Sequence, residues 1–369
     1  MEFGWPELKG VIMDFGVEHS FPVAAAFSKD EAQEIFWRCL YTATTQEIYH
    51  YWVVLPKYVK PVELDPIQFK DVGLINIGRY ISQEASFYME VWVAYENAPW
   101  EMNPSDWLFN KLTLMGEEIL HKRIINHPSG AGKFADVLTF KRLNSGETVI
   151  SRYTVQKDYN PLDGGGNYFL LKVSCAEKDY EENANIIYFT AVNWDISHRS
   201  NLLLAELLTT VTAGKESGIS FKIPDSWASK VIADNRLVIE HTFNDINHGV
   251  INLCFFSKMA YISPEQVFTM ATSRFNKHDN AVALSADGPK NIANDINDHL
   301  DDAFFEWDGE IISAAEKVRA LYKAYVFGCD DVWCYAEMVG PHLNHKDYYL
   351  EANLRCLEII LSTFDKQRQ

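Results

Sequence analysis

Apolar and polar residues alternate along much of the chain, and this period of two residues is typical of β-strands. Residues 86–95 carry one apolar face with Phe87, Met89, Val91 and Val93, and a second face with Tyr88, Glu90 and Trp92. In the first half the pattern predicts further strands at residues 51–55, 72–81, 134–141, 148–157, 168–175 and 186–194. In the second half it predicts strands at residues 221–224, 237–243, 250–256, 304–314, 318–327 and 332–339. We therefore expect a protein rich in β-sheet.

Helical spacing of apolar residues appears in fewer places. It predicts helices near residues 29–45, 104–119, 197–212 and 346–364, and one that starts at residue 264. Two of these have clear start signals, because Asn103 precedes Pro104 and Ser263 precedes Pro264. Ser263 and Gln266 also have the spacing of a capping box.

The order of these elements repeats along the chain. A strand ending in proline comes first, then strands, a helix started by proline, four or so strands and a leucine-rich helix. Pro56 and Pro224 lie 224 − 56 = 168 residues apart, and Pro104 and Pro264 lie 264 − 104 = 160 apart. We expect an α+β protein of two tandem antiparallel-sheet domains with helices packed on the sheets. The predicted parts are an N-terminal extension and helix at 1–45, a first repeat at 46–214 and a second repeat at 219–369.

Composition narrows the possible partners. The 369 residues carry a formal net charge of −18, with 47% hydrophobic and 23% charged residues. An acidic surface repels phosphate backbones and anionic lipids, so nucleic acid and membrane partners are disfavoured. The N-terminus lacks the pattern of a secretory signal, and no stretch has the roughly 18 apolar residues of a spanning helix. Six scattered cysteines fit a reducing compartment, and we predict a cytoplasmic protein.

Each repeat resembles the PsbP-like domain, which also occurs in the DcrB-like family. The resemblance rests on three motifs of the second repeat: Phe221-Lys222-Ile223-Pro224-Asp225-Ser226-Trp227, Ser263-Pro264-Glu265 and Leu361-Ser362-Thr363-Phe364. The first repeat lacks the tryptophan after its strand-ending Pro56. The resemblance implies antiparallel sheets with helices, no enzymatic activity and no cofactor. One similar branch comprises acidic cytoplasmic chaperones that load effectors for type VI secretion and hold apolar helices as dimers. By that analogy the tandem would act as an intramolecular pseudo-dimer.

Two groups of residues offer candidate chemistry. His342, His345 and Asp347 cluster before the last helix, with Cys329 and Cys334 upstream, and could serve a metal or a nucleophile. Glu117, Glu118 and His121, at spacings of three and four, could share one face of the helix that is predicted to begin at Pro104. The second repeat has no matching acids or histidine, so a solvated helix face is the favoured interpretation of this second group.

A binding function is the leading hypothesis. Both faces of several strands are apolar, which indicates a sheet covered on both sides by the protein's own helices or by those of a partner. The candidate partner-binding residues are Tyr88, Trp92, Leu321, Tyr325 and Phe327. We expect a non-catalytic chaperone or adaptor for an apolar helical segment of another protein. The alternatives are a small-molecule or metal-dependent enzyme that uses His342 and His345, and a structural or immunity-type interaction protein.

Overall fold

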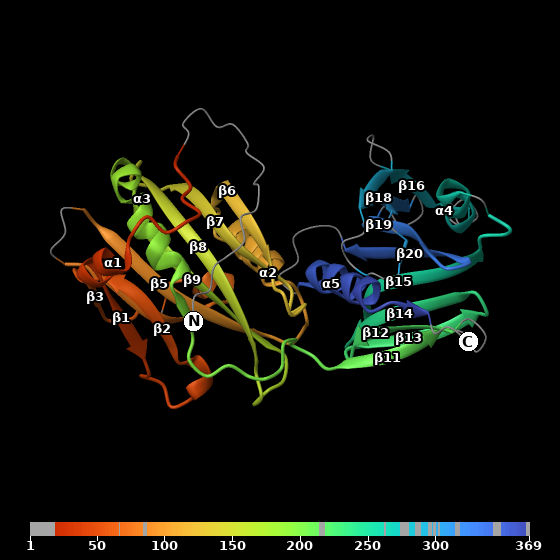
Figure 1. Cartoon of the computed structure of the whole chain (residues 1–369), viewed down its shortest axis with the longest axis horizontal. Helices are drawn as coiled ribbons and strands as arrows, with labels where there is room; N and C mark the ends of the chain where they lie inside the picture. The colour runs from red at the N-terminus through yellow and green to blue at the C-terminus, as the bar shows by residue number, and fades with distance from the viewer. Residues whose placement is uncertain are drawn as a thin grey trace. The chain divides into compact units, whose positions relative to one another are not determined.

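The chain forms two compact units, shown in the computed structural model of Figure 1. The structure describes residues 19–65, 67–83, 87–213, 218–261, 263–273, 280–284, 289–293, 297, 300–301, 303–313, 318–341 and 348–366. Unit 1 comprises the residues up to Pro99 together with Asn103–Ala205. Unit 2 comprises Trp100–Met102 and Glu206–Gln369.

Unit 1 is built on a seven-stranded antiparallel sheet with the order β3-β4-β5-β9-β8-β7-β6. Its strands are β3 (Val59–Pro61), β4 (Ile75–Ser82), β5 (Met89–Ala98), β6 (Glu118–Asn126), β7 (Lys133–Arg142), β8 (Thr148–Tyr159) and β9 (Gly166–Ala176). A smaller sheet contains β1 (Phe36–Tyr41), β2 (Tyr51–Pro56) and β10 (Trp194–Ile196). The helices are α1 (Lys29–Ile35), α2 (Pro104–Leu114) and α3 (Glu177–Val192), with 3-10 turns at η1 (Glu47–Tyr49) and η2 (Lys70–Val72).

Helix α3 packs on one face of the large sheet, against β8 and β9 (Figure 1). Tyr180, Ala184, Ile187 and Ala191 recur at helical spacing and are all buried. They join Val91, Leu171 and Val173 of the sheet in one hydrophobic cluster. This packing fixes the position of α3 beside the β6–β8 side of the sheet, where the candidate site described below is found.

Unit 2 contains an antiparallel sheet with the order β13-β14-β15-β20-β19-β18-β16, and β17 also pairs with β18. The strands are β13 (Trp227–Ala233), β14 (Arg236–Phe243), β15 (Ile246–Ser257), β16 (Asn280–Leu284), β17 (Lys290–Ala293), β18 (Ala303–Ser313), β19 (Val318–Cys329) and β20 (Val332–Pro341). A smaller sheet joins β11 (Leu208–Ala213), β12 (Ile219–Pro224) and β21 (Asp365–Lys366). Helices α4 (Pro264–Thr272) and α5 (Tyr349–Ser362) complete the unit.

The two units share one order of elements. In each large sheet three consecutive strands are followed by the last strand, and the remaining strands then run backwards to the other edge. A helix follows the third strand in both units, as α2 and α4, and another follows the last strand, as α3 and α5. The predicted α+β class with two antiparallel-sheet domains is therefore confirmed.

The helix predicted near residues 29–45 is wrong after Ile35. Helix α1 ends there, and Phe36–Tyr41 forms strand β1, which pairs with β2. The stripe of Ile35, Phe36, Cys39 and Leu40 has helical spacing, but six cross-strand pairs with β2 override it.

Three further predictions are wrong. Residues 186–194, predicted as a strand, lie mostly in α3. The helix predicted at 197–212 does not form, since residues 208–212 belong to β11 and residues 197–207 are not helical. Helix α2 ends at Leu114, so Glu118 and His121 lie on strand β6 and share no helix face with Glu117. Glu117 instead accepts hydrogen bonds from Tyr153 and Thr139, at 2.9 and 2.7 Å.

None of the helices within the described parts of the chain is long and apolar enough to cross a membrane. The cytoplasmic location remains a prediction.

Candidate functional site

The predicted partner-binding residues differ in exposure. In unit 1 Tyr88 is exposed, whereas Trp92 is buried on β5, with Phe69 at its edge and the Arg79 guanidinium 4.7 Å from its ring. In unit 2 Phe327 is buried in the hydrophobic cluster beneath α5, and Leu321 and Tyr325 pack against that cluster half-buried. Partner binding at these residues remains a prediction, and Tyr88 is the most exposed of them.

The residues of the enzymatic alternative give no described site. His342, His345 and Asp347 lie outside the described residues. Cys329 and Cys334 are buried, and burial raises the pKa of both thiols, which disfavours the reactive thiolate at neutral pH. In the portion of the chain that the structure describes, no three His, Cys, Asp or Glu side chains form a group that could hold a metal ion.

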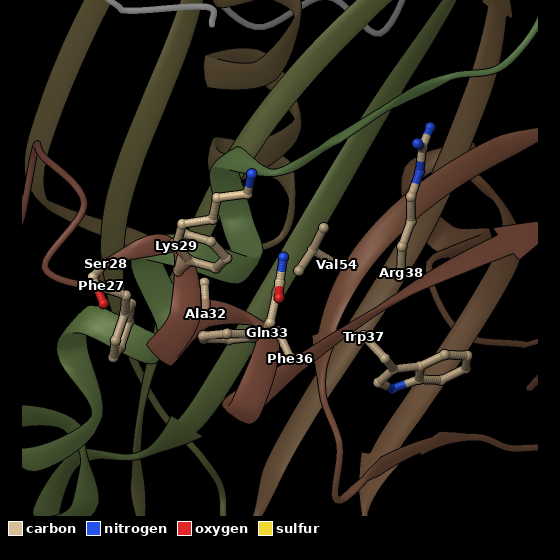
Figure 2. A pocket seen from close by; sticks show the side chains of 10 residues that line it. Phe27, Ser28, Lys29, Ala32, Gln33, Phe36, Trp37, Arg38 and Val54 are labelled. Atoms are coloured by element: carbon tan, nitrogen blue, oxygen red, sulfur yellow. The ribbon is translucent and has the colours of Figure 1, made fainter. Parts of the chain in front are cut away.

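An open apolar depression lies beside α1 in unit 1 (Figure 2). It has a volume of about 360 Å³. Phe27, Phe36 and Phe189 line it, with ring centroids 4.5–5.6 Å apart. Lys29 and Arg38 also line it. The depression offers apolar contact to a ligand, but its lining contains no carboxylate, histidine or cysteine for chemistry.

The best-defined candidate site in unit 1 holds an extended segment of the chain itself. Residues 19–23, which lead toward α1, contact side chains from β6, β8 and α3; we call this arrangement of β6, β8 and α3 the groove. Four backbone carbonyls of the segment have side-chain partners in the groove: Ser20 with Tyr180 at 2.7 Å, Pro22 with Arg152 at 2.7 Å, Val23 with both Arg123 at 3.1 Å and Tyr188 at 2.9 Å, and His19 with His121 at 3.0 Å. Most of these bonds therefore recognise main chain rather than side chain.

Glu181 on α3 holds the start of the segment. Its carboxylate accepts hydrogen bonds from the Ser20 backbone N–H at 3.2 Å and from the Ser20 hydroxyl at 2.8 Å, and it lies 3.1 Å from His19 Nδ1. Partial burial opposes ionisation, but the bonds from Ser20 and His19 outweigh it and lower the pKa of Glu181. The carboxylate is thus charged at neutral pH and suited to accept these hydrogen bonds.

Phe21 is the side-chain anchor of the segment. Its ring stacks on His121, with centroids 5.4 Å apart and planes 19° apart. The Arg152 guanidinium lies 4.4 Å from the Phe21 ring and 4.5 Å from the Tyr188 ring. The Phe21 ring of the segment therefore packs among three planar side chains of the groove: His121, Arg152 and Tyr188. The contact between the Arg152 cation and the Phe21 ring is strongest where water is excluded.

A buried ion cluster from β6, β7 and β8 bonds the segment at Pro22 and Val23. Arg152 and Asp136 are 0% and 1% exposed, and two nitrogens of Arg152 donate to Asp136 at 2.8 and 2.7 Å. Arg123 donates to the same carboxylate at 2.9 Å. Two guanidinium groups thus share one carboxylate, and the carbonyls of Pro22 and Val23 supply further acceptors. A backbone segment laid over the cluster satisfies donors that would otherwise be costly to bury.

The sequence pattern does not predict this groove. Its partners lie 100 to 165 positions apart along the chain, as for Arg123 with Val23 and Tyr188 with Val23. The one signal in the sequence is charge. Asp136 and Arg152 are charged residues inside the predicted strands 134–141 and 148–157, whereas Arg123 lies between predicted elements. Charged residues on the inner face of a predicted strand favour a paired or functional role.

Comparisons with known proteins add little. No family model matches the sequence, and no curated protein matches it. The solution structure of cyanobacterial PsbP (CyanoP) from Synechocystis sp. PCC 6803 is similar over 43% of this chain and 92% of its own, with 9% identity and a TM-score of 0.32. A crystal structure from Bacteroides thetaiotaomicron VPI-5482 covers 43% of this chain and 50% of its own, with 11% identity and a TM-score of 0.28. The first neighbour belongs by name to the PsbP family, which each repeat resembles. At these TM-scores the similarity does not assign a function to this chain.

Proposed function

We propose that the protein is a non-catalytic binding protein that holds an extended polypeptide segment in the groove of unit 1. One observation carries the proposal. The groove already contains such a segment, and it holds that segment chiefly through the backbone carbonyls of His19, Ser20, Pro22 and Val23. Because every peptide has these carbonyls, a segment of another protein with a different sequence satisfies the same donors.

This proposal changes one feature of the chaperone hypothesis. The hypothesis expects the protein to hold an apolar helix, whereas the occupant of the groove is extended and its contacts are largely polar. A chaperone or adaptor that grips an extended segment is consistent with both. The more specific form, in which the segment belongs to an effector of type VI secretion, rests only on the sequence resemblance.

The test compares partner capture by full-length variants. Phe21→Ala removes the aromatic anchor of the internal segment, so a partner segment should displace the internal one more readily. Adding Tyr180→Phe and Tyr188→Phe to that variant removes two donors to the bound backbone, at about 1 kcal/mol each, and should weaken binding about 30-fold. Each tagged protein is incubated with extract from its native cells, and recovered proteins are quantified by mass spectrometry.

We expect one partner to be recovered best by Phe21→Ala and much less by the triple variant. Phe27→Ala is the matched control, because Phe27 lies in the same part of the chain but its ring contacts are with Phe36 and Phe189, not with the side chains that hold residues 19–23. It should recover no more partner than the unmodified protein. Equal recovery of a partner by all four proteins would place binding elsewhere and overturn the proposal.

A further inference from the structure

We propose that the space between Arg152 and His121 is a recognition slot for a flat aromatic side chain of the partner, and that Phe21 is a tethered competitor which occupies it. This inference rests on the proposed function and adds the chemical class of the ligand. The ligand is an extended peptide with an aromatic residue at the level of Phe21.

The geometry of the slot favours a planar ring. Its two walls are themselves planar groups, the Arg152 guanidinium at 4.4 Å from the Phe21 ring and the His121 imidazole at 5.4 Å between centroids. A branched aliphatic side chain is too thick to lie flat against both walls, and it has no π-system to face the cation.

The two walls of the slot are held in different ways. Arg152 is fixed by two hydrogen bonds to Asp136 and by the Tyr188 ring on its other side. The His121 ring contacts the segment itself, since its Nε2 lies 3.0 Å from the His19 carbonyl and its ring stacks on Phe21. The Arg152 wall is therefore preformed, which lowers the ordering cost of binding a ring.

The hydrogen bonds on either side of Phe21 align a peptide with the slot. The Tyr180 hydroxyl donates to the carbonyl before the ring, at Ser20, and the Arg152 guanidinium donates to the carbonyl after it, at Pro22. A partner that offers an aromatic residue in an extended backbone therefore satisfies both donors and fills the slot at once. This coupling gives sequence specificity to a groove whose other hydrogen bonds bind only the peptide backbone.

The internal segment sets the threshold for binding. A short tether gives an effective concentration in the millimolar range, so a free peptide competes poorly with Phe21 in the unmodified protein. When the slot is open in only a fraction of molecules, the apparent affinity falls by that fraction. Removing the Phe21 ring should therefore raise the affinity for an added aromatic peptide at least tenfold.

The experiment titrates the full-length Phe21→Ala protein with fluorescent eight-residue peptides and follows fluorescence anisotropy. The parent peptide has the sequence of residues 19–26, His-Ser-Phe-Pro-Val-Ala-Ala-Ala. Three others replace its phenylalanine by tryptophan, leucine or alanine. We expect the phenylalanine and tryptophan peptides to bind, and the leucine and alanine peptides to bind at least tenfold more weakly. Phe27→Ala, the matched control, should bind the parent peptide no better than the unmodified protein does.

Each outcome decides between the two proposals. Equal binding of all four peptides overturns the aromatic slot and leaves peptide binding by the groove intact. Tight binding of the leucine peptide also overturns the slot, because it indicates apolar contact without stacking. If no peptide binds at millimolar concentration to a variant with native circular dichroism, the proposed function itself fails. Should Phe21→Ala aggregate, Phe21→Leu retains an apolar cover over Arg152 and is titrated in the same way.

Discussion

At the scale of single residues, substitutions in the buried ion cluster of unit 1 should destabilise the protein most. Asp136 compensates both Arg123 and Arg152, and all three are less than 10% exposed. Removing the shared acid would leave two buried cations without their counter-charge. We expect Asp136→Asn to lower the free energy of unfolding by about 3–5 kcal/mol, measured by urea denaturation. Asp195→Asn is the control, since its ion pair with Arg199 is more than one third exposed and should contribute about 0–1 kcal/mol.

His241 of unit 2 predicts a pH dependence of stability. The ring is fully buried, its two nitrogens have no hydrogen-bond partner, and it stacks on Trp227 at 4.9 Å. Burial, with a smaller contribution from His248, lowers the pKa of His241 to about 4. The unfolded chain therefore binds a proton below its ordinary pKa of about 6.5, while the folded chain stays neutral down to about pH 4.

The sign follows from this difference in proton binding. The stability that comes from keeping His241 neutral is fully present above about pH 6.5. It is lost progressively as the pH falls toward 4, by at most about 3 kcal/mol. The measurement is the urea midpoint at pH 7.5 and at pH 5.0 for the unmodified protein and for His241→Phe. The variant lacks the buried imidazole, so it should lose less stability on acidification. An identical loss in the two proteins would remove His241 as the cause.

At the scale of elements, local signals predicted some helices and long-range pairing decided others. Helix α4 begins where Ser263, Pro264 and Gln266 predict it, because a cap involves only neighbouring residues. Strand β1 escaped prediction because it is fixed by pairing with β2, which the spacing of Phe36 and Cys39 does not reveal. The groove escaped for the same reason, since Pro22 and Arg152 lie 130 positions apart and no local pattern connects them.

The cap of α4 supports a prediction at this scale. The Ser263 hydroxyl accepts a hydrogen bond from the Gln266 backbone N–H at 3.3 Å. Ser263→Ala removes this acceptor and should cost about 1 kcal/mol, seen as faster amide hydrogen exchange over the first turn of α4. Ser273→Ala, at the other end of the helix, is the matched control. It removes only the hydrogen bond that the Ser273 hydroxyl donates to the Met270 carbonyl, and it should leave exchange over the first turn unchanged. Unchanged exchange in both variants would show that the cap contributes nothing to α4.

At the scale of the whole molecule, the repeated topology carries a repeated charge pair. In unit 1 the acid Asp136 lies opposite Thr154, two residues after Arg152 on β8. In unit 2 the acid Glu306 lies opposite Tyr325, two residues after Lys323 on β19, and Lys323 bonds Glu306 at 3.0 Å. The same register thus places a cation and a carboxylate side by side in both sheets. Their surroundings differ, because Arg152 is 0% exposed beneath residues 21–22, whereas Lys323 and Glu306 are 21% and 15% exposed.

Burial rather than strand register should therefore decide how much each charge pair contributes to the free energy of unfolding. We expect Arg152→Met to destabilise unit 1 by about 3–5 kcal/mol, since it leaves Asp136 short of a buried partner. Lys323→Met should cost unit 2 less, about 1–2 kcal/mol, because Lys323 and its partners Glu306 and Asp308 are partly exposed to water. Hydrogen exchange followed by mass spectrometry measures the two units separately, through peptides from β8 and β19. If the two substitutions cost the same, burial beneath residues 21–22 does not increase what the pair of Arg152 and Asp136 contributes to stability.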